Sequence, residues 1–198
     1  MEELNKPLQI NASSKIANPG PLGLCAFGMT TFLLNLHNAG FVEMNATILT
    51  MGLFYGGLAQ VMAGYIESKK NNTFGLTAFT SFGFFWLSLV TIILFPKSAM
   101  NDPTSSLAMG CYLSSWGIFT MLLFVGTLKI NRSIQFVFAS LTVHFFLLAA
   151  GDVFACARIT KFAGYEGILC GISAIYTGIA ELLNEIFGRD LIPLDKIK

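Results

Sequence analysis

A few polar side chains inside long apolar stretches are the residues best suited to chemistry in this sequence. Phe27, Thr31 and Asn38, with Asn35 close by, fall on one side of an expected helix. Polar groups at membrane depth are costly and usually face protein or water. A polar stripe that also carries an aromatic ring indicates a narrow solute path. The alternative is that the same groups form hydrogen bonds between helices.

Three further polar residues interrupt the apolar stretches. His144 stands midway along one of them, where it either changes charge near neutral pH or is a neutral, packed side chain. Glu181 lies near the end of the last stretch, where it is structural, guards a vestibule or exchanges a proton. Gln60 lies in a stripe of glycines spaced by four, which favours close helix packing with a hydrogen bond from its amide to a neighbouring helix.

The segment Asn18-Pro-Gly-Pro predicts a sharply defined helix start. Proline is favoured in the first turn, and Asn18 or Gly20 can cap the helix. Free N–H groups and the helix dipole make such an end a ready anion site. The alternative is an ordinary start of a membrane helix.

The sequence carries no recognisable catalytic or metal-binding motif. It has no P-loop and no HExxH, and its two histidines and four cysteines lack metal-ligand spacing. Ser140 and His144 stand one helical turn apart, which alone is weak evidence for a hydrolase. We therefore expect no enzyme, no cofactor and no metal, and favour a channel or secondary transporter.

Composition shows which elements must position these residues. Of 198 residues, 54% are hydrophobic and only 12% are charged, with a mean hydropathy of +0.66 and a net charge of +1. Soluble domains carry about 25% charged residues. These values exclude a soluble globule, a disordered chain and a nucleic-acid binder.

Apolar stretches long enough to cross a bilayer predict six helices, and thus an all-α, polytopic membrane protein. They fall at roughly 22–39, 46–66, 73–95, 106–128, 133–151 and 165–187. We expect one six-helix transmembrane domain over residues 21–188, between an N-terminal segment, 1–20, and a tail, 189–198.

Basic residues predict the orientation. One side collects nine, namely Lys6, Lys15, Lys69, Lys70, Lys129, Arg132, Arg189, Lys196 and Lys198. The other side has three, Lys97, Arg158 and Lys161. Because cytoplasmic loops carry the excess of basic residues, both termini are expected in the cytoplasm of a cell-membrane protein.

Several motifs together resemble one family. The run NPGPLGL at 18–24 is similar to the NPAPLGL signature of the acetate uptake transporter family, the succinate–acetate permeases of bacteria, archaea and fungi. Further similar segments are GMTTFLLNLHN, MGLFYGGLAQ, KKNNTFGLTAFTS, GTLKINRSIQFVF, FAGYEGILCGISAIY and ELLNEIFGR. They follow in the family's order over nearly the whole chain from Asn18.

The resemblance implies a homohexamer in the membrane, with one pore for small monocarboxylates in each protomer. The solute is chiefly acetate, in some members succinate, and transport is proton-coupled or channel-like. The family's hydrophobic constriction corresponds to Phe27, Phe82 and Leu141, where Phe82 departs from the usual tyrosine. Ala174 matches a position that helps set substrate size.

We expect the solute carboxylate to bind near Asn18 on the cytoplasmic side and to meet Thr31, Asn35 and Asn38 beyond the constriction. His144 matches no family motif. Two other classes remain as alternatives: a hexameric urea- or amide-type channel, and a non-transporting acetate sensor.

Overall fold

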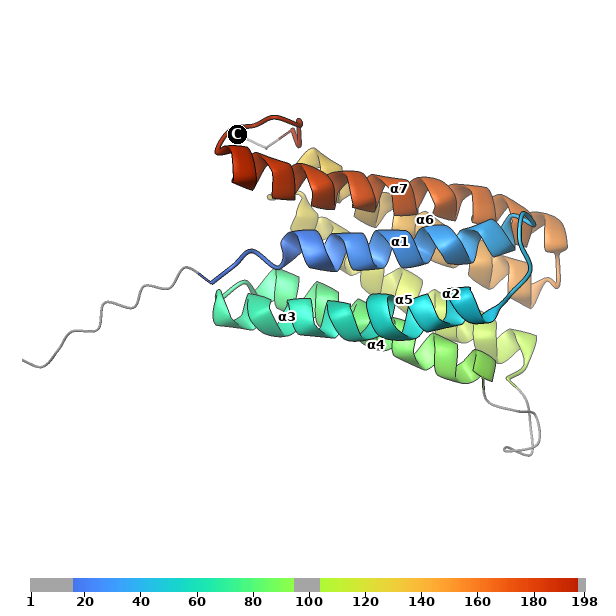
Figure 1. Cartoon of the computed structure of the whole chain (residues 1–198). Coiled ribbons are helices and arrows are strands. Elements are labelled where there is room, and N and C mark those ends of the chain that lie inside the picture. The colour runs from blue at the N-terminus through green and yellow to red at the C-terminus, as the bar shows by residue number, and fades with distance from the viewer. Residues whose placement is uncertain (1–15, 95–103, 196–198) are drawn as a thin grey trace, which may run out of the picture.

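The chain folds into six helical rods that run antiparallel (Figure 1). The computed structural model describes residues 16–94 and 104–195. The rods are α1 (Gly20–Asn38), then α2 (Ala46–Met51), η1 (Gly52–Ala59) and α3 (Gln60–Lys69) as one rod, then α4 (Thr73–Leu94), α5 (Ser106–Thr127), α6 (Arg132–Val153) and α7 (Ala157–Phe187). No strand occurs in these described ranges. The prediction of six helices is confirmed.

Side-chain caps define several of the helix starts. Asn45 accepts hydrogen bonds from the backbone N–H groups of Thr47 and Ile48 at the start of α2. Ser105 and Asn131 cap α5 and α6 in the same way. At the other end, α7 stops at Gly188, whose φ of +62° is left-handed and favours glycine.

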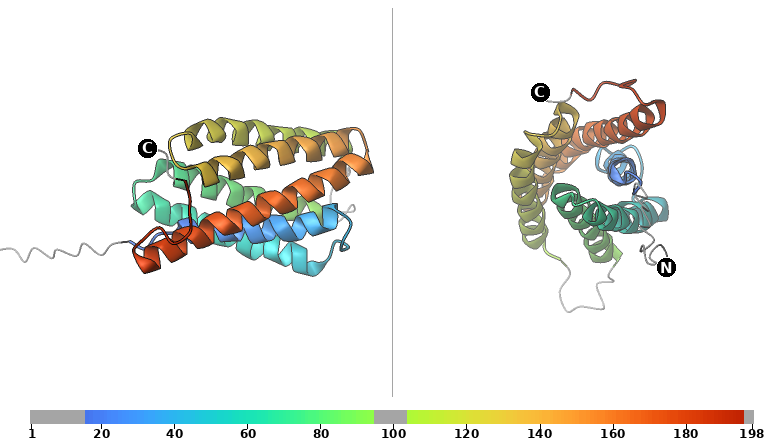
Figure 2. Two further views of the ribbon diagram at one scale, coloured as in Figure 1. Left: turned by 90° about the horizontal axis from the view of Figure 1, so that it is seen from above. Right: turned by 90° about the vertical axis from the view of Figure 1, so that its left-hand side faces the viewer.

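The rods form a closed ring when viewed along their axes (Figure 2). Around the ring, α1 packs on α7, α7 on α6 and α6 on α5, while α4 packs on α3 and η1, which return to α1. Between α4 and α5 the ring is closed by aromatic side chains. Phe85 of α4 contacts Tyr112 and Trp116 of α5, with ring centroids 5.9 and 5.2 Å apart.

The contact between α1 and α7 is a contact of backbones. A Cβ atom on Gly28 would lie 2.7 Å from the carbonyl oxygen of Gly171, and one on Gly171 would lie 2.8 Å from that of Gly28. Small residues at this crossing therefore let the two helices approach more closely than any side chain allows.

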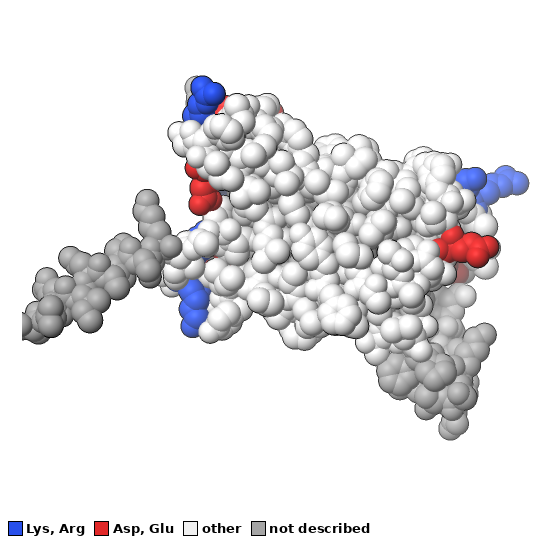
Figure 3. Space-filling view, in the orientation of Figure 1, with Lys and Arg blue, Asp and Glu red and all other residues white. Residues whose placement is uncertain are grey.

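The surface agrees with a membrane environment. Charged side chains gather at the two ends of the rods, and a broad uncharged belt lies between them (Figure 3). Among the described residues, five rods are long and apolar enough to cross a membrane. The sixth, α1, has 19 residues but carries the polar stripe predicted above.

Two details of the helices differ from the sequence prediction. The last helix begins at Ala157 instead of 165, because Arg158 and Lys161 lie exposed in its first turns and do not end it. At 1.5 Å per residue its 31 residues span about 46 Å, more than the hydrocarbon thickness of about 30 Å. The second rod contains the π-helix η1, which the glycine spacing did not predict.

Part of the predicted flanking segments lies outside the described residues. This holds for most of the N-terminal segment, 1–20, and for the last three residues of the tail, 189–198. It also holds for five basic residues used in the orientation argument: Lys6, Lys15, Lys97, Lys196 and Lys198.

Candidate functional site

Three cavities follow one another along the inside of the ring. The first, here called the inner vestibule, has a volume of about 400 Å³ and lies at the end where α1 begins, lined by Asn18, Glu67, Lys70 and Glu181 among others. The second, the neck, measures only about 20 Å³. The third, the outer vestibule, measures about 210 Å³ and lies toward the end of α1.

Shared side chains join these cavities into one line. Leu24, Ala78, Phe79 and Phe138 line both the inner vestibule and the neck. Phe27 and Leu141 line both the neck and the outer vestibule. The neck therefore separates two larger spaces in the same protomer.

The structure brings the three predicted constriction residues together at the neck. Phe27, Phe82 and Leu141 are each no more than 5% exposed and come from α1, α4 and α6. The rings of Phe27 and Phe82 lie 5.9 Å apart, and Phe138 lies 6.0 Å from Phe82. Since a single water needs about 10–15 Å³, the neck as it stands admits little more than one.

Gln60 is the polar member of the neck lining. It is 1% exposed, and its amide oxygen has no hydrogen-bond partner. The hydrogen bond predicted from the Gln60 amide to a neighbouring helix is therefore not made by this oxygen. Buried polar atoms usually have a hydrogen-bond partner. The unpartnered Gln60 oxygen at the neck can therefore accept a hydrogen bond from a donor group of a passing solute.

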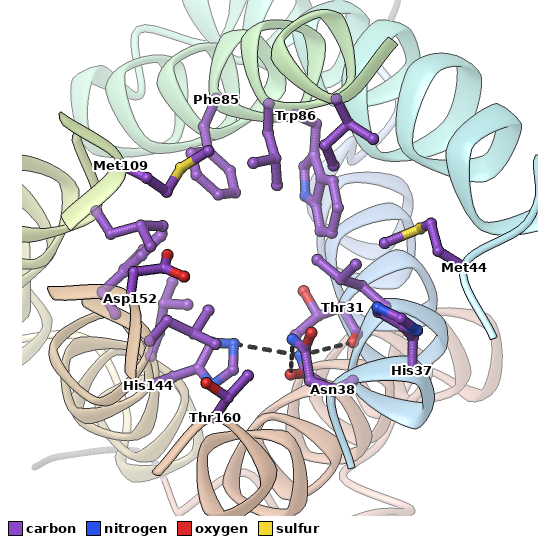
Figure 4. A pocket seen from close by; sticks show the side chains of 18 of the residues that line it. Thr31, His37, Asn38, Met44, Phe85, Trp86, Met109, His144, Asp152 and Thr160 are labelled. Carbon is purple, nitrogen blue, oxygen red and sulfur yellow. Dashed lines mark hydrogen bonds between the residues drawn. The ribbon is translucent and has the colours of Figure 1, made fainter. Parts of the chain in front are cut away.

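The outer vestibule holds the predicted polar stripe of α1 (Figure 4). Thr31, Asn35 and Asn38 all line it. The Thr31 hydroxyl and the Trp86 indole N–H are buried there without a hydrogen-bond partner. An indole nitrogen only donates, and a hydroxyl can donate, so both can bind an anion just beyond the neck. Sequence reasoning missed Trp86, because a tryptophan in an apolar helix looks like packing.

His144 also lines the outer vestibule, and its Nε2 lies 3.2 Å from the Asn35 amide nitrogen. Behind it, Glu166 of α7 lies 3.2 Å from His144 Nδ1 and accepts a hydrogen bond from Ser140. Because the serine hydroxyl donates to the carboxylate and not to the imidazole, the group lacks the geometry of a hydrolase triad. The sequence analysis missed Glu166, although an acidic residue inside a predicted span is itself a signal.

The inner vestibule already contains carboxylates of the chain itself. The Asn18 side chain accepts hydrogen bonds from the Gly20 backbone N–H and from Lys70. A Cβ on Gly20 would lie 2.5 Å from a carboxylate oxygen of Glu181. The N-cap position is Pro19 and not the predicted Asn18 or Gly20, although the Asn18 side chain still accepts the first N–H of the helix, that of Gly20. The predicted anion site at this helix end is covered by Glu181 and is not an open site in this structure.

Ala174 lies apart from the three cavities. It is fully buried in the hydrophobic core and lines neither the neck nor a vestibule. Within the described ranges, no group of three or more His, Cys, Asp or Glu side chains is placed to hold a metal ion.

A ring of membrane-length helices around a pinched line of cavities defines a polytopic membrane protein of the channel and transporter class. Comparison with known proteins gives the family. The model of the GPR1/FUN34/yaaH family matches residues 1–191. The chain therefore belongs to the GPR1/FUN34/yaaH family.

Individual relatives match over almost their full length. The chain is 56% identical over 182 residues to the succinate-acetate/proton symporter SatP of Escherichia coli (strain K12), covering 92% of this chain and 97% of that protein. It is 50% identical over 195 residues to an uncharacterized protein of Methanothermobacter thermautotrophicus, covering 93% and 94%. A solved structure described as the bacterial acetate channel SatP superposes with a TM-score of 0.89 at 57% identity, over 91% of this chain and 99% of that chain. These relatives are transporters or channels, not enzymes, where their names state an activity.

Proposed function

We propose that this chain moves acetate and related small carboxylates, with succinate as a further candidate, across the cell membrane in a process linked to protons. The observation that carries the proposal is the line of two vestibules joined by one apolar neck inside a single protomer. The names of the symporter and channel relatives support the solute class.

The polar groups beside the neck suit a carboxylate. The Thr31 hydroxyl and the Trp86 N–H offer donors to a carboxylate on the outer side. The unpartnered oxygen of Gln60 at the neck is an acceptor, so it suits the O–H of a protonated acid. Among the residues that the structure describes, no lysine or arginine lines the neck or the outer vestibule. Binding is therefore weak enough for the solute to leave again, which conduction requires.

The neck must open for a solute to pass. A volume of about 20 Å³ is too small for acetate, and the neck lining is apolar apart from Gln60. Rotation of Phe27, Phe82 or Leu141 widens it without moving a backbone. A carboxyl group with an ordinary pKa near 4.3 is only about 0.2% protonated at pH 7, so a path for the anion adds greatly to passage of the acid through lipid.

The test is flux of radiolabelled acetate into proteoliposomes, with and without an imposed proton gradient. We expect saturable uptake that other short carboxylic acids inhibit and that the gradient increases. Protein-free liposomes are the control for passage of the acid through lipid. Flux of urea without gradient-driven accumulation supports an amide-type channel instead, and acetate binding without flux supports a sensor.

We further propose that six copies assemble in the membrane, with both termini in the cytoplasm. The family resemblance supports the hexamer, and the exposed apolar belt provides the surface for contacts with lipid and other copies. The excess of basic residues on one side supports the orientation. Asn18 and Glu181 then belong to a cytoplasmic vestibule, with Glu181 as its guard.

A further inference from the structure

A buried ionisable pair lies beside the outer vestibule, between α6 and α7. His144 and Glu166 have side chains that are 5% and 15% exposed, and His144 Nδ1 lies 3.2 Å from Glu166 Oε2. Ser140 donates a hydrogen bond to the other oxygen, Glu166 Oε1. Only Oε1 therefore has a hydrogen-bond partner, whereas the buried Oε2 has none, although His144 Nδ1 lies 3.2 Å from it.

The hydrogen bonds around His144 determine its tautomer. Its Nδ1 lies 3.1 Å from the Ala163 carbonyl oxygen and also faces Glu166, so this nitrogen carries the hydrogen. Its Nε2 lies 3.2 Å from Asn35 Nδ2. Asn35 Nδ2 also donates to the Thr31 carbonyl at 2.9 Å, and Asn35 Oδ1 accepts from Asn38 at 2.9 Å. These partners orient the amide so that its nitrogen donates to Nε2, which is then the acceptor.

A proton arriving at Nε2 must therefore change Asn35. A protonated Nε2 is a donor, so the Asn35 amide has to turn its oxygen toward it. That turn releases the Asn38 side chain and the Thr31 carbonyl from their present hydrogen bonds. Since Asn35 and Asn38 line the outer vestibule (Figure 4), the proton changes which groups meet the solute.

The packing around the pair is built to keep these groups together. A Cβ on Gly167 would lie 2.3 Å from the Asn35 amide and 2.4 Å from His144 Cε1, so only glycine permits this approach. The other titratable groups nearby are Cys170 on α7, which interacts electrostatically with Glu166, and His37 and Asp152, which line the same vestibule from α1 and α6. From α5 the vestibule is lined by Met109 and Leu113, which carry no charge.

We propose that His144 and Glu166 form the proton-binding site of the transport cycle, and that Asn35 links this site to the solute path. In the loading step a hydronium ion in the outer vestibule gives its proton to His144 Nε2: one O–H bond breaks, one N–H bond forms, and water remains. The imidazolium is paired with the Glu166 carboxylate, which offsets part of the cost of a buried charge. The inference rests on the proposed acetate transport.

The test compares two activities of the full-length protein in proteoliposomes. One is acetate accumulation driven by a proton gradient, with proton entry followed by an internal pH dye. The other is exchange of labelled for unlabelled acetate at equal concentrations and equal pH. We expect Glu166→Gln and His144→Gln to lower the ratio of accumulation to exchange at least tenfold. Glu43→Gln, an exposed carboxylate outside the cavities, is the matched control and keeps the wild-type ratio.

The outcomes separate the two proposals. If the wild-type protein neither accumulates nor exchanges acetate, the proposed function is wrong. If it exchanges acetate but moves no protons, or if both variants keep the wild-type ratio, the proton site is wrong while acetate transport stands. Should Glu166→Gln not fold, Ser140→Ala removes one hydrogen bond from Glu166 and is expected to shift the pH of half-maximal accumulation. An unchanged pH profile of that variant overturns the inference.

Discussion

At the scale of single residues, the neck owes its closure to three apolar side chains from three different helices. Phe27, Phe82 and Leu141 meet there, and Phe138 packs against the ring of Phe82. None of these four side chains can hydrogen-bond to a carboxylate, so they select by size and by the cost of desolvation. Gln60 is the one polar side chain of the neck, and the unpartnered donors Thr31 and Trp86 lie beyond it.

Shortening Leu141 to alanine is expected to widen the neck and admit larger carboxylates. Removing three carbons from a tight apolar site changes discrimination by about tenfold or more. Uptake of labelled succinate relative to acetate in proteoliposomes measures the effect. Leu113→Ala removes the same atoms from the outer vestibule and should leave the ratio near wild type. Unchanged discrimination in Leu141→Ala contradicts the assignment of the neck.

Replacing Trp86 with phenylalanine is expected to weaken acetate binding while keeping the apolar wall. The change removes the unpartnered indole N–H, and a hydrogen bond to a charged group contributes about 1.5–3 kcal/mol. The half-saturating acetate concentration should rise about tenfold or more. The control is Trp116→Phe, because Trp116, the other tryptophan of the chain, lines none of the three cavities. Equal behaviour of the two variants would remove Trp86 from the solute path.

Sequence reasoning could place some of these residues and not others. The family motifs identified Phe27, Phe82 and Leu141, and helical periodicity grouped Thr31, Asn35 and Asn38 on one face. Neither could pair Glu166 with His144, because that contact joins two helices. How the two helices are rotated relative to each other cannot be read from the sequence of either one. The sequence likewise could not predict that Glu181 covers the start of α1, since the two lie about 160 residues apart.

At the scale of helices, close backbone contact holds α1 against α7. The paired glycines, Gly28 and Gly171, leave no room for a Cβ atom on either side. This contact fixes where Phe27 and Asn35 point, because both lie on α1 on either side of it.

Gly28→Ala and Gly171→Ala should each destabilise the protein. The new Cβ atom would meet a backbone carbonyl that cannot move aside, and overpacking costs about 1–3 kcal/mol. The midpoint of thermal unfolding in detergent should fall by roughly 2–10 °C. Gly126→Ala is the matched control, because its Cβ would meet only the ring of Phe74, at 3.2 Å. Equal midpoints for the three variants would mean that the crossing tolerates a side chain.

Apolar length predicted the six rods, but it could not give their local form. Arg158 and Lys161 looked like loop residues, although an exposed first turn of a long helix accommodates them. The glycines of the π-helix η1 lie close against Trp86, Val90 and Leu87 of α4, and no local sequence pattern records these contacts.

At the scale of the whole molecule, six antiparallel rods put the two ends of the described chain, residues 16 and 195, on one side of the bundle, and we expect both termini on that side of the membrane. We expect protease-cleavable tags at both termini to be cut together in inverted vesicles and to be protected in intact spheroplasts. The physical reason is the excess of basic residues on that side. Cleavage of only one tag would contradict an even number of crossings, and cleavage of both in spheroplasts would reverse the orientation.

Six copies are expected in each assembled particle. Native mass spectrometry of the detergent-purified protein measures the number directly, with the chain mass of 21.5 kDa as the unit. A monomer that still conducts acetate would show that the hexamer is not needed for transport, since each protomer contains its own line of cavities.

The seam between α4 and α5 is unlike the rest of the ring, since stacked and edge-on aromatic rings fill it. The Tyr112 hydroxyl donates a hydrogen bond to the Phe85 carbonyl across this seam, so the seam opens when that bond breaks and the rings rotate. The glycine crossing between α1 and α7 packs backbone against backbone, and we expect it to yield less easily than the α4–α5 flank. Motions that widen the neck for a solute should therefore concentrate at the α4–α5 seam. A bulky hydrophobic compound bound among these aromatic rings would then block transport from the side of the protomer.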